Sequence, residues 1–257
     1  MENPFITIVI PARMASSRYP GKPLVSIAGL PLIEHVRRRA LLVKEANMVV
    51  VATCDTQISE AVENEGGIAI MTKSTHERCT DRIHEAIDKL PGDIIVMVQG
   101  DEPLLIPHAV SALVKPLLDD PSLPIVNLLS PLESDKDYSN SNIVKAACNV
   151  KGDIMFFSRT AIPFFRTQVK VPVYRQTGIM AFRRAALNLF SNLPATPLEQ
   201  AESVDMFRAI EHGMRIYGVM TDYSTVGVDR PEDVTVVEEI LKDNKVQKNL
   251  FSLIYKK

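Results

Sequence analysis

The stretch FITIVIPARMASSRYPGKPL, residues 5–24, decides the fold, because a short apolar run passes directly into a polar loop that carries cations. FITIVI (5–10) is the first of four short apolar runs bounded by turn residues, followed by those at 48–53, 68–71 and 94–98. Such runs are typical of strands buried on both faces of a parallel sheet. Helical patterns separate the runs, at 31–46, 56–66 and 80–90. The alternation predicts an α/β fold with a mostly parallel central sheet and helices on both faces.

The second half of the chain has a different pattern. Strand-like runs follow one another with little helix between them, at 124–129, 143–148, 153–158 and 173–182. Helical patterns return at 197–213 and 231–244, and two polar stretches, 131–142 and 164–173, are predicted to be exposed loops. The pattern predicts a smaller mixed-sheet lobe at roughly 127–220. No linker or repeat forces a domain boundary, so we expect one domain over 1–257 with this lobe inserted in it.

Composition narrows the class of protein. The 257 residues can bury the core of one large α/β domain, and a net charge of -2 argues against a nucleic-acid binder. The N-terminal MENPF lacks a secretory leader pattern, and no apolar run approaches the roughly 20 residues that cross a bilayer. Cys54, Cys79 and Cys148 form no CxxC pair, so neither a disulfide framework nor a zinc site is indicated. We therefore expect a cytoplasmic protein without membrane insertion.

Three polar segments follow predicted strands or open a predicted helix, and ligands of open α/β sheets bind at the carboxyl ends of strands. The first segment is the loop after FITIVI, which is predicted to be exposed. Gly21 permits a tight turn there, and donors for phosphate oxygens come from Arg13, Ser16, Ser17, Arg18 and Lys22. Neither GxGxxG nor GxxxxGK[ST] is present. The loop is either a phosphate-binding loop or a solvated polar turn.

The second segment is QGDEP, residues 99–103, directly after IIVMV. Pro103 keeps Glu102 extended, so Asp101 is expected to project from the strand end. A carboxylate there can hold Mg²⁺, a hard cation that takes one or two carboxylates and completes its shell with water and phosphate oxygens. An acidic turn that merely solvates the strand end is the alternative.

The third segment is GVDRPEDV, residues 227–234. Asp229 with Glu232 three positions later resembles a capping box that opens the last long helix, and a metal-binding role for Asp229 is compatible with it. A further oddity lies in TDRIHEAI, residues 80–87, where Arg82 stands near the positive end of a predicted helix. Arg82 is either a plain surface residue or a cation held for an anionic ligand.

Together these segments resemble the 3-deoxy-manno-octulosonate cytidylyltransferases, also called CMP-KDO synthetases, nearly from end to end. The resemblance is carried, in the expected order, by IPARMASSRYPGKPL, PLIEHV, VATCD, THERCTDR, VQGDEPL, FFSRTAIP, YRQTGIMAF, PLEQAES and GVDRPEDV. It implies a nucleotide-diphospho-sugar transferase-like fold and a homodimer. It also implies a Mg²⁺-dependent reaction in which CTP and a 2-keto-3-deoxy sugar acid give the CMP-sugar and pyrophosphate.

The resemblance also implies roles for individual residues. Catalysis would rest on Lys22, Arg13 and Asp101, and magnesium would be held by Asp101 and Asp229. The nucleotide would be bound by Arg13, Ser16, Lys22, Thr80, Asp81, Arg82 and Gln99. The acidic sugar would be bound by Arg159, Arg166, Arg175, Gln176, Glu199 and Glu202, because the planar fork of arginine suits a carboxylate and the other side chains suit hydroxyls.

The sugar-facing motifs depart from the family's pattern. THERCTDR stands where a motif like DHxSGTDR is usual, Gln176 replaces a histidine, and Cys54 replaces a common aspartate. The acceptor therefore stays open among KDO, 8-amino-KDO and another ulosonic acid. A nucleotidyltransferase with another base or acceptor and a non-catalytic sensor of nucleotide or sugar acid are the remaining alternatives. If the product is CMP-KDO, the resemblance implies a role in lipopolysaccharide synthesis.

Overall fold

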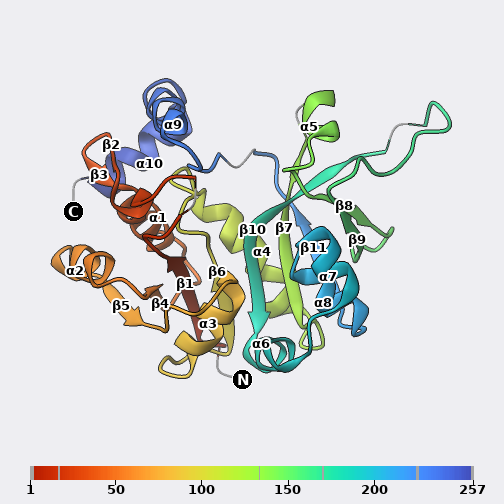
Figure 1. The fold of residues 1–257 in the computed structure, drawn as a ribbon, viewed down its shortest axis with the longest axis horizontal. Helices are drawn as coiled ribbons and strands as arrows, with labels where there is room; N and C mark the ends of the chain where they lie inside the picture. Colours follow the sequence, from red (N-terminus) through yellow and green to blue (C-terminus); the bar gives the residue numbers. More distant parts are fainter. Residues whose placement is uncertain (1–2, 17, 133, 170, 224–225, 256–257) are drawn as a thin grey trace. The chain divides into compact units, whose positions relative to one another are not determined.

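A computed structural model describes residues 3–16, 18–132, 134–169, 171–223 and 226–255 (Figure 1). The chain forms two compact units: the first comprises residues 1–111 and 225–257, and the second comprises residues 112–224. The predicted lobe at 127–220 falls within the second unit. The N-terminal and C-terminal parts of the chain therefore belong to one unit, and the second unit lies between them in the sequence.

The first unit contains four parallel strands. They are β1 (Ile6–Ala12), β4 (Met48–Thr53), β5 (Ile68–Met71) and β6 (Ile94–Met97), in the order β6-β1-β4-β5. Every residue of β1 is buried, as in a strand covered on both faces. The mostly parallel sheet predicted from the four apolar runs is confirmed.

Helices α1 and α3 both pack against β1 and β4. The predicted helices of the first half are present as α1 (Leu32–Ala40), α2 (Thr56–Asn64) and α3 (Cys79–Ile87). The first unit also contains the 3₁₀ turn η1 (Lys22–Leu24), the hairpin of β2 (Ser26–Ile27) and β3 (Leu30–Pro31), α9 (Pro231–Asp243) and α10 (Lys245–Tyr255). Residues of α4 (Pro107–Asp119) belong to both units.

The second unit contains the predicted mixed sheet. Its strands are β7 (Ile125–Pro131), β8 (Lys145–Cys148), β9 (Ile154–Ser158), β10 (Tyr174–Arg183) and β11 (Ile216–Met220). β10 runs antiparallel to β7 and β8, β8 runs antiparallel to β9, and β11 runs parallel to β7. Its short helices are α5 (Asp135–Ser139), α6 (Arg184–Asn192), α7 (Pro197–Glu202) and α8 (Met206–Glu211).

Two local expectations for the second unit are wrong. The predicted loop at 131–142 contains α5, which begins because the Ser134 hydroxyl accepts the N–H of Asp137 at 3.2 Å. The single helix predicted at 197–213 is interrupted at Ser203, whose φ of 52° lies in the left-handed region and ends α7. Within the described part of the chain, the helices are all too short or too polar to span a membrane.

His35 is a fully buried histidine on α1. Its Nε2 lies 2.7 Å from the Ile27 carbonyl oxygen, and its ring stacks on Phe251 of α10 with 5.4 Å between the ring centroids. Burial lowers its pKa from 6.5 to about 4, because the apolar surroundings penalise the charged imidazolium. The folded chain therefore keeps His35 neutral near neutral pH, with an N–H available for Ile27.

His35 is expected to make folding sensitive to mild acid. The unfolded chain binds the proton near pH 6.5 and the folded chain only near pH 4, so the stabilisation is full above pH 6.5 and is lost as pH falls toward 4. The lost contribution amounts to about 3 kcal/mol at most. Urea unfolding at pH 7 and pH 5 should show a smaller pH dependence for His35→Gln than for the wild-type chain. If the free energy of unfolding changes equally with pH in the two chains, this role of His35 is refuted.

Candidate functional site

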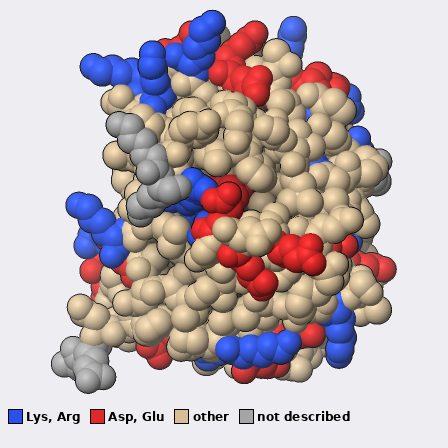
Figure 2. Space-filling model, turned by 90° about the vertical axis from the view of Figure 1, so that its left-hand side faces the viewer, with Lys and Arg blue, Asp and Glu red and all other residues tan. Residues whose placement is uncertain are grey.

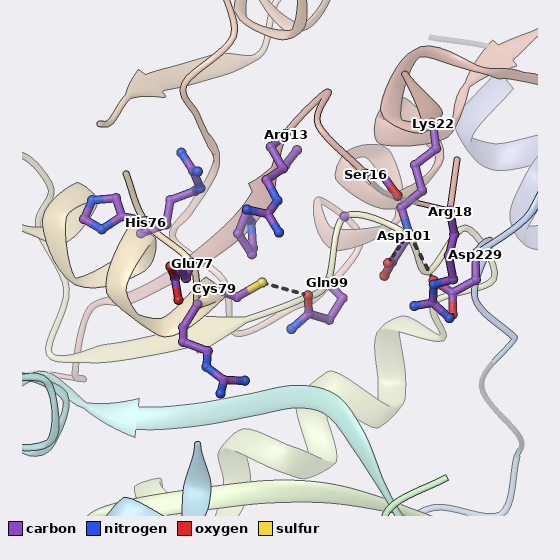
Figure 3. A pocket seen from close by; sticks show the side chains of 15 residues that line it. Arg13, Ser16, Arg18, Lys22, His76, Glu77, Cys79, Gln99, Asp101 and Asp229 are labelled. Atoms are coloured by element: carbon purple, nitrogen blue, oxygen red, sulfur yellow. Dashed lines mark hydrogen bonds and ion pairs between the residues drawn. The ribbon is translucent and has the colours of Figure 1, made fainter. Parts of the chain in front are cut away.

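A pocket of the first unit lies where β1 and β6 end and α3 begins (Figure 3). Its walls carry more positive than negative side chains. The cations are Arg13, Arg18, Lys22, Arg78 and Arg82, and the carboxylates are Glu77, Asp101 and Asp229. A pocket with this balance suits an anionic ligand such as a phosphate chain.

The loop after β1 is folded on itself by its own backbone. The Met14 carbonyl accepts the N–H groups of Ser16 and Gly21, each at 2.9 Å. Gly21 has a φ of 77°, a conformation that glycine adopts without a Cβ clash. Immediately after it, η1 begins at Lys22, with Pro23 in its first turn. We call residues 13–22 the phosphate loop; of these, Ser17 lies outside the described residues.

Lys22 is the centre of the charged contacts in the pocket. Its Nζ lies 2.7 Å from Asp101 Oδ2 and 3.3 Å from Asp229 Oδ1 (Figure 3). It also lies 2.9 Å from the Val228 carbonyl oxygen. The Lys22 side chain is only 13% exposed. The expectation that the loop is exposed is therefore wrong for Lys22, because its ammonium group is drawn inward by two carboxylates and a carbonyl.

Backbone contacts bring Asp101 and Asp229 together although they are far apart in the sequence. A Cβ at Gly100 would lie 2.7 Å from the Pro11 carbonyl oxygen, so only glycine lets the turn after β6 approach the end of β1 this closely. The Val228 N–H then donates to the Asp101 carbonyl at 2.9 Å. The two aspartates are thus placed on adjacent segments that are hydrogen-bonded to each other.

The predicted capping box of Asp229 and Glu232 is wrong by one position. Helix α9 begins at Pro231 with Arg230 as its N-cap residue, and the carboxylate of Asp233 in the first turn accepts the N–H groups of Asp229 and Arg230 at 2.8 Å each. Asp229 lies one residue before the N-cap, and its carboxylate contacts Lys22 and also Arg18, whose Nη1 lies 3.0 Å from Asp229 Oδ2. Asp229 therefore belongs to the pocket rather than to the helix cap.

Arg82 and Gln99 line the pocket from α3 and from the turn after β6. Arg82 is 3% exposed, and its Nη1 donates to Thr72 Oγ1 at 2.6 Å and to the Lys73 carbonyl at 3.3 Å. Its Nη2 is buried and has no partner, so a donor remains for a ligand atom. Gln99 Oε1 accepts from the Cys79 thiol at 3.4 Å.

The structure brings together most of the predicted nucleotide and metal residues. Those that line the pocket are Arg13, Ser16, Lys22, Arg82, Gln99, Asp101 and Asp229. Thr80 and Asp81 are not among the lining residues, and Thr80 is buried in the first turn of α3. The Arg82 interpretation as a plain surface residue is wrong, because its guanidinium is buried.

The donor atoms around Lys22 fit a hard cation. The carboxylates of Asp101 and Asp229 and the Val228 carbonyl all present oxygen, which Mg²⁺ prefers, with few protein ligands and several from water and phosphate. Across the described ranges, no set of three or more His, Cys, Asp and Glu side chains is placed to hold a metal on its own. The chemistry of these oxygen atoms therefore fits a magnesium ion, which Asp101 and Asp229 would hold.

Four consecutive pocket residues, 76–79, were not among the predicted site residues. His76 contacts Glu85 through Nε2, and the Lys73 N–H lies 3.0 Å from the same Glu85 oxygen. These contacts, the Lys73 N–H foremost, lower the pKa of Glu85. The unusual THERCTDR sequence was the available signal, because it concentrates charged and thiol side chains before a helix.

The predicted sugar residues all lie in the second unit. Arg159 donates through Nε to the Glu202 carbonyl at 2.6 Å and through Nη1 to the Ser141 carbonyl at 3.1 Å. The Glu202 carboxylate accepts the Arg159 N–H at 2.9 Å and the Ser158 hydroxyl at 3.1 Å. These contacts join the end of β9 to the end of α7.

The remaining predicted sugar residues differ in exposure. Gln176 on β10 is half-buried and donates to Asn127 Oδ1 at 2.9 Å, and Arg175 beside it has a buried Nε without a partner. Arg166 is exposed in the segment between β9 and β10. Glu199 is 3% exposed, and its carboxylate pairs with Arg208 at 2.9 and 2.5 Å. Glu199 thus holds α7 against α8.

Charged side chains on one face of the molecule lie in separate groups. In the view of Figure 2, the described Lys and Arg residues occur in small groups with Asp and Glu nearby, separated by uncharged surface. The chain as a whole has a net charge of -2, so the excess of cations that line the pocket is not a property of the whole molecule.

Comparisons with known proteins agree with the pocket chemistry. A family model described as Cytidylyltransferase matches residues 7–216. A Pelobacter propionicus protein named 3-deoxy-manno-octulosonate cytidylyltransferase is 40% identical over 245 residues, 91% of this chain and 96% of that protein. An Escherichia coli protein of the same name is 40% identical over 234 residues, 91% of this chain and 95% of that protein.

A solved structure is similar to this chain throughout. It is described as CMP:2-keto-3-deoxy-manno-octonic acid synthetase complexed with CTP. The TM-score is 0.89 at 40% identity, and the match covers 93% of this chain and 98% of that one. The two chains therefore share one fold over most of their length.

Proposed function

This chain belongs to the 3-deoxy-manno-octulosonate cytidylyltransferase family, and we propose that it transfers the CMP group of CTP to a 2-keto-3-deoxy sugar acid with release of pyrophosphate. The acceptor is KDO or a close relative. The observation that carries the proposal is Lys22, whose Nζ lies between the carboxylates of Asp101 and Asp229 beside the phosphate loop. Cations next to paired carboxylates suit a metal-assisted reaction of a polyphosphate.

In the proposed mechanism, CTP lies in the pocket with its phosphates against the phosphate loop. Arg13, Ser16 and Lys22 donate to phosphate oxygens, and the unpartnered Nη2 of Arg82 and the amide of Gln99 offer further polar contacts to the nucleotide. Lys22 and Arg82 are held by hydrogen bonds within the protein before the ligand binds. These two cations therefore provide part of the positioning on which phosphoryl transfer depends.

The reaction needs no protein nucleophile. The anomeric hydroxyl oxygen of the sugar forms a bond to the α-phosphorus, the bond from that phosphorus to pyrophosphate breaks, and the hydroxyl proton is released. Lys22 and Arg13 neutralise the charge that develops on the departing pyrophosphate. Mg²⁺, when held by Asp101 and Asp229, supplies further positive charge to the phosphate oxygens.

The acidic sugar is proposed to be bound by residues of the second unit. Arg159, Arg166 and Arg175 offer guanidinium groups for the sugar carboxylate, and Gln176 and Glu202 offer polar atoms for its hydroxyls. Arg175 supports this assignment because its Nε is buried without a partner. Glu199 is left out of the proposed contacts, because it is only 3% exposed and its carboxylate is engaged with Arg208. Arg159 and Glu202 also contact protein groups, but they are half-buried and keep a surface that a sugar can reach.

We further propose that the enzyme acts in the cytoplasm as a homodimer. The CMP-sugar would then serve lipopolysaccharide synthesis if the acceptor is KDO. Sedimentation of the purified chain over a range of concentrations measures the oligomeric state, and a monomer at all concentrations would refute the homodimer.

Pyrophosphate release tests the proposed reaction. Release is expected from CTP with Mg²⁺ and one of KDO, 8-amino-KDO or a sialic acid, and EDTA should abolish it. UTP, GTP and ATP should support at most a few per cent of the rate. Preference for another nucleotide would indicate a different nucleotidyltransferase, and CTP binding without release from any sugar acid would indicate a sensor.

A further inference from the structure

We propose that Asp55 is a positioning residue that holds the phosphate loop in the shape required to bind CTP. This inference rests on the proposed function of the pocket but concerns a residue outside it. Asp55 follows β4, whose residues pair in parallel with β1, and its Oδ2 accepts the N–H of Met14 at 2.8 Å. Met14 lies in the phosphate loop, two residues beyond the end of β1.

The orientation of the Asp55 side chain is the first argument. Asp55 is the N-cap residue of α2, where an aspartate ordinarily accepts an N–H from the first turn of its own helix. Its side chain makes no such cap. Only its backbone carbonyl serves α2, accepting the N–H groups of Ile58 at 3.1 Å and Ser59 at 3.2 Å. The carboxylate is turned away from the helix and toward the loop.

The position of Met14 is the second argument. The Met14 N–H is held by Asp55, and the Met14 carbonyl accepts the N–H groups of both Ser16 and Gly21. Fixing Met14 therefore fixes both ends of the turn that leads into Lys22. Without Asp55, the Met14 N–H loses its acceptor, and the turn loses its hydrogen bond to the segment that follows β4.

The phosphate loop is held at two places, one by apolar contact and one by the hydrogen bond to Asp55. Tyr19 packs against a buried cluster that includes Ile27, Leu32 and Val228, so the later part of the loop is held by apolar contact. The earlier part is held by the Asp55 carboxylate, which also accepts from the Cys54 thiol at 3.4 Å. Removing Asp55 should thus loosen residues 13–16 and leave the core packing of Tyr19 intact.

The chain offers a matched control for this experiment. The Asp93 carboxylate accepts the N–H of Phe5 at 2.7 Å, just before the amino end of β1, so it makes the same kind of bond beyond the opposite end of the strand. Asp55→Ala is expected to raise KM for CTP by about tenfold, since a carboxylate hydrogen bond that shapes the loop is lost. KM for the sugar acid should stay within about twofold.

Two further variants test whether loss of the hydrogen bond to Met14 causes the rise in KM for CTP. Asp55→Asn keeps an oxygen acceptor for the Met14 N–H, so its KM for CTP should lie within about twofold of the wild-type value. Asp93→Ala should leave KM for CTP unchanged. Amide hydrogen exchange of the peptide spanning residues 13–22 should be faster in Asp55→Ala than in Asp93→Ala. An unchanged KM in Asp55→Ala, or a defect of Asp55→Asn as large as that of Asp55→Ala, would overturn the proposal.

Calorimetric titration with CTP tests the role of Asp55 independently of the proposed reaction, because it measures binding without turnover. If the wild-type chain releases no pyrophosphate with any sugar acid, the proposed function fails by itself. The affinities of wild type, Asp55→Ala and Asp55→Asn for CTP still show whether Asp55 holds the loop in the shape that binds CTP. A weaker affinity in Asp55→Ala alone supports the positioning role, and equal affinities in all three overturn it.

Discussion

Asp101→Asn and Asp229→Asn are each expected to lower kcat at least about a hundredfold, with the folded structure retained. Both carboxylates contact Lys22 Nζ, and both are proposed to hold a divalent cation. An amide keeps the shape of the side chain but loses the negative charge that such a cation requires. The expected loss is therefore in the chemical step and in the response to magnesium.

The measurement is kcat against magnesium concentration for both variants, with thermal unfolding as a check on folding. Glu232→Gln provides the control, because Glu232 is exposed on the first turn of α9 next to the site and its ion pair with Arg230 is long, at 3.7 Å. It should retain wild-type kcat. Near-normal turnover in both aspartate variants would remove the metal site from the mechanism.

Lys22→Ala is expected to lower kcat about a hundredfold to a thousandfold. The ammonium group is held within 3.3 Å of both aspartates and is only 13% exposed, so its loss removes a preorganised cation from the place where pyrophosphate departs. Folding should be affected less, because Asp101 and Asp229 are 32% and 47% exposed and solvent screens their repulsion.

Steady-state rates and thermal unfolding of the same preparation separate these two effects. Lys115→Ala is the matched control, since Lys115 makes a 2.8 Å ion pair with Asp119 on the exposed side of α4. It should change neither kcat nor the unfolding temperature by much. A Lys22→Ala enzyme that keeps its kcat would show that Lys22 only balances the charge of the two aspartates.

The parallel core could be predicted because each of its strands is a continuous apolar run. β1 is buried at every position, and this is the burial that FITIVI indicates when no polar residue alternates with apolar ones. The end of β6 likewise predicted where Asp101 would project. Local sequence patterns were sufficient to predict these features, because each of them depends on one strand and the turn that follows it.

Long-range contacts explain what the sequence did not reveal. The spacing of Asp229 and Glu232 is that of a capping box, and only the folded chain shows that the box is formed by Arg230 and Asp233 while Asp229 contacts Lys22. Asp55 reads as a helix N-cap, and its bond to Met14 depends on two neighbouring strands. Helix α4 was missed because Pro116 lies inside it and disturbs the helical pattern.

The central claim is transfer of the cytidylyl group, and CTP labelled at the α-phosphorus tests it most directly. Wild-type enzyme with Mg²⁺ and the accepted sugar acid should move the label into a CMP-sugar, with one pyrophosphate released for each labelled product. Asp101→Asn should leave the label in CTP. Label recovered as free CMP without sugar product, or remaining in CTP with every sugar acid tried, would contradict the account.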